Sequence, residues 1–65
     1  MIRLPCDNLD SFVQGVKHFY SVNSNDFKKG QRVILYNDEY EATFEIQLLI
    51  YFEENTVLGL KYVRN

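Results

Sequence analysis

The second half of the chain alternates between apolar and polar residues in the segment YEATFEIQLLIYFE, residues 40–53. One set of alternate positions is apolar throughout, while the other combines Glu41, Glu45 and Glu53 with Leu49 and Tyr51. Because successive side chains of a strand point to opposite faces, the pattern predicts a β-strand with one buried face and one mostly solvated face. Such a strand would span about 45 Å if straight, so we expect a bend or bulge near residues 47–49.

The segment DNLDSFVQGVKHFYSV, residues 7–22, has a different periodicity. Its apolar residues recur at spacings of three, four and seven, which predicts an amphipathic helix over residues 8–20. Asp7 or Asn8 is expected to cap its N-terminus. Gly15 weakens the helix, so a pair of strands turning at Gly15 is the alternative. The preceding segment MIRL predicts a short strand that ends at Pro5.

The remaining patterns predict two further strands, QRVILY (residues 31–36) and VLGLKYV (residues 57–63), with a turn at Asn37 and Asp38. We therefore expect an α+β fold, in which an N-terminal helix packs on a three-stranded antiparallel meander. Residues 1–65 would form a single small domain. The alternative is an SH3-like small β-barrel, because DFKKGQRVILYNDEYEATFEI resembles the opening of such barrels. That likeness covers about a third of the chain and does not indicate a family.

Cysteine and histidine usage excludes several site types. The single Cys6 forms no internal disulfide, and His18 is the only histidine, so we expect no zinc or other metal site. The chain has no phosphate-cradling motif, which predicts no cofactor. The lone cysteine, and the lack of an apolar run suited to a signal peptide or membrane span, predict a cytoplasmic protein without a membrane anchor.

Catalytic groups are few. Cys6 and His18 form the only candidate nucleophile and base, and the helix interpretation places them about 15 Å or more apart. Glu41 and Glu45 could act as paired carboxylates, yet a small sheet with one helix offers little room for a partly dry pocket. We therefore expect a protein that is not an enzyme.

Charge is distributed unevenly along the chain, although the net charge is only −2. Residues 33–60 contain six acidic residues and no lysine or arginine. The predicted function is a small protein-interaction module, a regulator or inhibitor that binds a basic partner surface through an acidic sheet face. A homodimer through an open strand edge or an apolar patch stays open as well. The predicted partner-binding residues are Glu41, Glu45, Leu49, Tyr51 and Glu53.

The segment FKKGQRVILY suggests a nucleic-acid-binding small barrel as the alternative function. Lys28, Lys29 and Arg32 would contact phosphates, and Phe27 or Tyr36 would stack on a base. Three cations make a small footprint, and the acidic strand that follows would repel a polyanion. Nucleic acid is therefore the less favoured partner.

Overall fold

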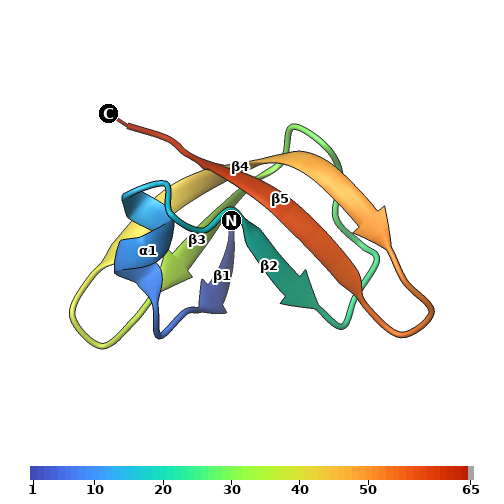
Figure 1. Cartoon of the computed structure of the whole chain (residues 1–65), viewed down its shortest axis with the longest axis horizontal. Coiled ribbons are helices and arrows are strands. Elements are labelled where there is room, and N and C mark those ends of the chain that lie inside the picture. The colour runs from blue at the N-terminus through green and yellow to red at the C-terminus, as the bar shows by residue number, and fades with distance from the viewer. Residues whose placement is uncertain (65) are drawn as a thin grey trace.

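The computed structural model, which describes residues 1–64, contains five strands and one short helix. All five strands join one mixed sheet in the order β1-β3-β4-β5-β2 (Figure 1). Strand β1 runs parallel to β3, and every other neighbouring pair is antiparallel. In chain order the elements are β1 (Ile2–Pro5), α1 (Leu9–Val13), β2 (Phe19–Val22), β3 (Arg32–Tyr36), β4 (Glu41–Tyr51) and β5 (Thr56–Tyr62).

The predicted α+β class is wrong, because the chain is mostly β-strand and its helix has only five residues. The expected strands β3, β4 and β5 form the middle of the sheet, but β1 and β2 extend it at the two edges. The curled five-stranded sheet is closer to the SH3-like barrel than to a helix on a meander.

Helix α1 ends early because Gly15 adopts a left-handed backbone conformation, with φ of 77°. The amides of Val16 and Lys17 both donate to the Ser11 carbonyl, which closes the last turn of the helix. The Asn8 side chain makes no capping hydrogen bond, contrary to expectation. Phe19 and Tyr20, the last aromatic residues of the helical stripe, instead enter β2, where Phe19 pairs with Gly59 of β5.

The sheet curls, so that its two edge strands approach each other. The Tyr20 hydroxyl on β2 donates to the Pro5 carbonyl on β1 at 2.5 Å. Strand β4 would span about 36 Å if straight, whereas the molecule is 32 Å along its longest axis. A bulge between Ile46 and Leu48 bends the strand, which confirms the irregularity predicted near residues 47–49.

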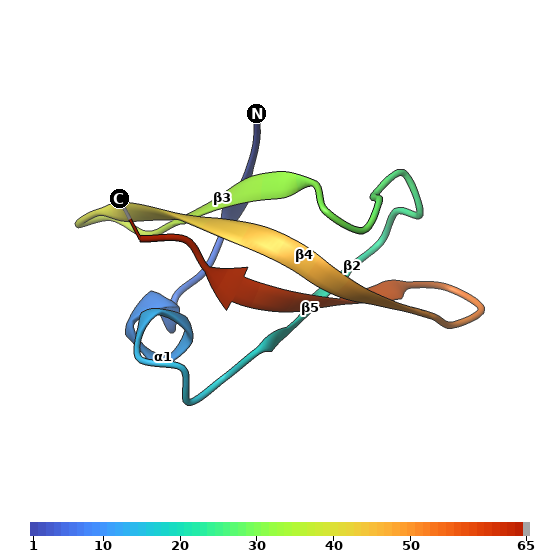
Figure 2. The same cartoon turned by 90° about the horizontal axis from the view of Figure 1, so that it is seen from above.

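One face of the sheet, here called the inner face, carries the hydrophobic core. Helix α1 lies beside β5 on this face (Figure 2) and buries Leu9 and Phe12 against it. The rings of Phe12 and Phe44 meet edge to face, with centroids 6.2 Å apart. The opposite side is called the outer face. The buried apolar strand residues of the inner face are Val22, Val33, Leu35, Phe44, Ile46, Leu58 and Leu60.

Candidate protein-binding face

The bulge in β4 changes which residues reach the outer face. Before it, Ala42, Phe44 and Ile46 point inward; after it, Leu49 packs against the core. Gln47 is the extra residue, so Leu48 and not Gln47 pairs with Gly59. An inserted residue exchanges the two faces of a strand with period two. The structure therefore places Leu49 inward, whereas strict alternation placed it outward among the glutamates.

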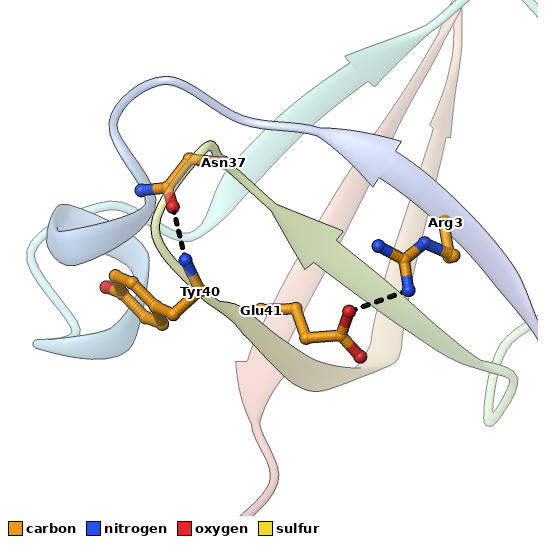
Figure 3. Close-up of polar contacts among 4 residues, drawn as sticks. All are labelled: Arg3, Asn37, Tyr40 and Glu41. Carbon is orange, nitrogen blue, oxygen red and sulfur yellow. Dashed lines mark hydrogen bonds and ion pairs between the residues drawn. The ribbon is translucent and has the colours of Figure 1, made fainter.

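The outer face before the bulge carries ion pairs. Glu41 accepts from the Arg3 guanidinium at 2.6 Å (Figure 3), and Arg32 Nε lies 3.8 Å from Glu45 Oε1. Lys61 on β5 lies opposite Glu45 in the sheet register. The two glutamates expected to form an acidic docking face thus each have a neighbouring cation within the molecule.

The start of β4 is held in place by side chains around its N-terminal end. Asn37 Oδ1 accepts the amide of Tyr40 at 2.9 Å (Figure 3). It also accepts the amide of Glu39, at 2.9 Å. The Tyr40 hydroxyl donates to the Asp10 carboxylate on α1. This hydrogen bond to Asp10 raises the pKa of Tyr40 to about 12, because the neutral phenol keeps the donated proton.

After the bulge, the outer face is apolar. Phe19, Gly59 and Leu48 lie in one register row across β2, β5 and β4, and Ser21, Val57 and Ile50 form the next row. We call Phe19, Leu48, Ile50 and Val57 the outer apolar patch. Phe19, Leu48 and Ile50 are 58%, 47% and 38% exposed. Neighbouring exposed apolar side chains of this kind are typical of binding sites.

Gly59 sets the shape of this patch. A Cβ atom at position 59 would lie 2.8 Å from the Leu48 Cβ, closer than real carbon atoms approach. Gly59 has no side chain between its register neighbours Leu48 and Phe19. A glycine inside a strand often marks such a close approach.

Tyr51 and Glu53 lie away from Glu41 and Glu45, at the turn between β4 and β5. They line a hollow of about 440 Å³ between this turn and the loop that follows β2. Within residues 1–64, neither Glu53 nor Glu54 makes an ion pair. The five predicted partner-binding residues are therefore divided among three places: the ion-paired half of β4, the core and this hollow.

The residues of the nucleic-acid alternative are also spread out. Lys28 and Lys29 are exposed in the loop before β3, and Arg32 lies beside Glu45 at the start of that strand. Tyr36 lies at the far end of β3, about 13 Å from Arg32 at the usual strand rise. Its ring is covered by the Arg3 guanidinium, 5.0 Å from the ring centroid. This arrangement does not gather cations around a stacking platform.

The groups considered for catalysis give no assembled site. Cys6 is buried, its thiol contacts Asn8 Oδ1 at 3.3 Å, and burial raises the pKa of the thiol, which keeps it protonated. In residues 1–64 no three His, Cys, Asp or Glu side chains are grouped to hold a metal ion. None of the helices formed by these residues is long and apolar enough to cross a membrane.

The prediction based on strict alternation does not identify the outer apolar patch. Phe19 fits the stripe of the predicted helix, and strict alternation places Leu48 and Ile50 on the buried face. The available signal was the unbroken apolar run LLIY, residues 48–51, which suits either face of a strand. Gly59 inside the last strand was a second signal.

Comparison with known proteins gives no further guide. Neither a protein-family model nor a curated protein matches this chain.

Proposed function

We propose that this protein is a non-enzymatic protein-interaction module that binds its partner through the outer apolar patch. The observation that carries the proposal is the group of exposed apolar side chains that the β4 bulge brings to one face. Desolvated aromatic and aliphatic anchors supply most of the binding energy at protein interfaces. The burial of the Cys6 thiol supports a role without covalent catalysis.

The partner surface would have an apolar centre, with basic residues only on the side that meets the turn between β4 and β5. Glu53 and Glu54 follow Phe52, which is 59% exposed, at the end of β4. Their carboxylates would attract lysine or arginine side chains, which favours a regulator or inhibitor that docks on a basic protein. A cytoplasmic location forms part of the proposal, and the single cysteine supports it.

Site-specific photo-crosslinking in the native host tests this function. One variant carries a photoreactive amino acid in place of Ile50, inside the patch. Its matched control carries the same group in place of Thr43, which lies on the same face of the same strand before the bulge. We expect a partner of fixed mass to be linked from position 50 and not from position 43.

A second comparison separates specific docking from nonspecific association through exposed apolar side chains. In lysate of the native host, each of two variants is added in excess to compete with the photoreactive protein. The double variant Leu48→Ser, Ile50→Ser lacks the patch, whereas Val16→Ser lacks an apolar side chain after α1 that is more exposed, at 71%. Only Val16→Ser should compete for the partner and reduce the cross-link, while both keep the thermal unfolding midpoint of a folded domain. Equal linking from positions 43 and 50, or a linked product made only of two copies of this chain, would contradict the proposal.

A further inference from the structure

Strand β5 extends past the strand beside it. The last register pair between β2 and β5 joins Phe19 to Gly59, while β5 continues to Tyr62 (Figure 1). One further contact follows, in which the Leu60 amide donates to the His18 carbonyl at 2.7 Å. Before His18 the chain turns away toward α1. Within residues 1–64, no strand therefore lies beside this edge of β5 beyond Leu60.

The backbone at this edge is oriented to accept another strand. Alternate residues of a strand direct their amide and carbonyl groups to opposite edges. Leu60 faces the β2 side, and the Val63 amide faces β4, where it donates to the Thr43 carbonyl at 2.9 Å. The amide and carbonyl of Tyr62 consequently face the open edge. An unpaired edge of this kind is a template for an added strand.

A groove runs along the same edge, between β5 and the segment that follows α1. Its volume is about 760 Å³, within the range of ligand-binding sites. Phe12 and Leu60, both almost fully buried, give it an apolar inner side. We call it the β5 edge groove. Its lining residues that matter here are Phe12, Val13, His18, Leu60, Lys61, Tyr62 and Arg64.

The charge of the groove favours an anionic ligand. Lys61 and Arg64 line it together with His18, and none of its lining residues among residues 1–64 is acidic. Glu45 lies opposite Lys61 in the sheet register but is also paired with Arg32. Arg64 lies over the Tyr62 ring, with 5.9 Å between the guanidinium carbon and the ring centroid. Lys61 belongs to the outer side of β5, whereas Leu60 and Tyr62 belong to the inner side. A strand placed here would meet positive charge on one face and apolar surface on the other.

We propose that the β5 edge groove binds an extended peptide in which acidic and apolar residues alternate, added to the sheet as a sixth strand. The peptide backbone pairs with the amide and carbonyl of Tyr62. Its apolar side chains contact Phe12 and Leu60, and its carboxylates face Lys61, with Arg64 at the end of the groove. Backbone pairing favours a peptide over a polynucleotide, which offers no such alternation of amides and carbonyls.

The probe is an end-blocked heptapeptide in which valine and glutamate alternate, added to the isotope-labelled protein at low salt. We expect the Tyr62 amide to shift in the NMR spectrum and to exchange more slowly with solvent once the probe is bound. The same peptide with lysine in place of glutamate should bind at least about tenfold more weakly. No binding of the glutamate probe, or an unchanged Tyr62 amide at saturation, would overturn the proposal.

Two N-methylated probes test strand addition directly. Methyl groups on the valine amides block an antiparallel strand, whereas methyl groups on the glutamate amides block a parallel one. One of the two must therefore lose binding and the other keep it. If both bind as well as the parent peptide, or a single-stranded oligonucleotide binds more tightly, the groove is only a cationic surface and the proposal is wrong.

Variants of the protein locate the site. Lys61→Glu with Arg64→Glu should weaken the glutamate probe at least about tenfold, while Lys28→Glu with Lys29→Glu, an equal charge change in a distant loop, should not. Equal losses from both pairs would contradict the assignment. The Leu48→Ser, Ile50→Ser variant should bind the probe as tightly as the wild type. The proposal for the β5 edge groove and the proposal for the outer apolar patch are therefore tested independently.

Discussion

The two halves of β4 share one strand and one outer face, yet they present opposite chemistry. The half before the bulge exposes Glu41 and Glu45, each beside an arginine of β1 or β3. The half after it exposes Leu48 and Ile50 with Phe19 from β2. Ion pairs satisfied within the molecule discourage docking, whereas exposed apolar surface favours it. One extra residue, Gln47, marks the boundary.

The largest expected effect comes from comparing an inner position before the bulge with an outer position after it. Ile46→Ala should lower the free energy of unfolding by about 2–5 kcal/mol, because Ile46 is fully buried. Ile50→Ala, the same change at an exposed position, should lower it by less than about 1 kcal/mol. Urea unfolding measures both. Equal losses of unfolding free energy would show that Ile46 and Ile50 are buried to the same extent, contrary to the structure.

Gly59 offers a test of the close approach that shapes the apolar half. Gly59→Ala should destabilise the protein by about 1–3 kcal/mol, because the new Cβ meets the Leu48 Cβ. Adding Leu48→Gly removes that contact and should recover part of the loss, whereas Leu48→Ala keeps the Cβ atom and should not. A double-mutant cycle with no coupling between positions 48 and 59 would contradict this geometry.

The neighbours Leu48 and Leu49 test the exchange of faces itself. Leu49→Ala should cost roughly 1–2 kcal/mol, less than a fully buried leucine because Leu49 is only partly buried. Leu48→Ala should cost less than about 1 kcal/mol. Uninterrupted alternation predicts the reverse order. Chemical denaturation of the two variants, measured side by side, decides between them.

Removing an ion pair from the charged half should have a smaller effect. Arg3→Ala leaves Glu41 without its partner, but both side chains are about half exposed, so the loss should stay below about 1 kcal/mol. Added salt should reduce the difference between variant and wild type further. A loss that is larger and independent of salt would mean that this half is held by more than exposed ion pairs.

The Tyr40–Asp10 hydrogen bond gives the charged half a pH dependence. The pKa of Tyr40 is raised in the folded state, so its contribution to stability is fully present below about pH 10 and is lost as the pH rises through about 12. Asp10→Asn should move the phenolate absorbance of Tyr40 to lower pH. A Tyr40→Phe variant identifies which tyrosine titrates, and an unchanged titration in Asp10→Asn would contradict the contact.

The strands were predictable where local residues decide them. Alternation located β4 and β5, a short apolar run located β3, and Pro5 located the end of β1. The helix was overestimated, because Phe19 and Tyr20 suit both a helical stripe and a strand, and pairing with β5 decided in favour of the strand. Uninterrupted alternation keeps Leu49 and Tyr51 on the face of the glutamates, whereas the bulge at Gln47 exchanges the two faces and separates them.

The sequence by itself determined the strand-forming segments, the need for a bend in a strand longer than the molecule, and the shortage of catalytic and metal-binding groups. These properties depend on residue type and spacing along the chain. Tertiary structure decided which side chains reach the outer face, which glutamates have cationic neighbours, and where β5 extends beyond the end of β2. Those outcomes depend on register between distant segments, and register is set by packing across the whole sheet rather than by any one strand.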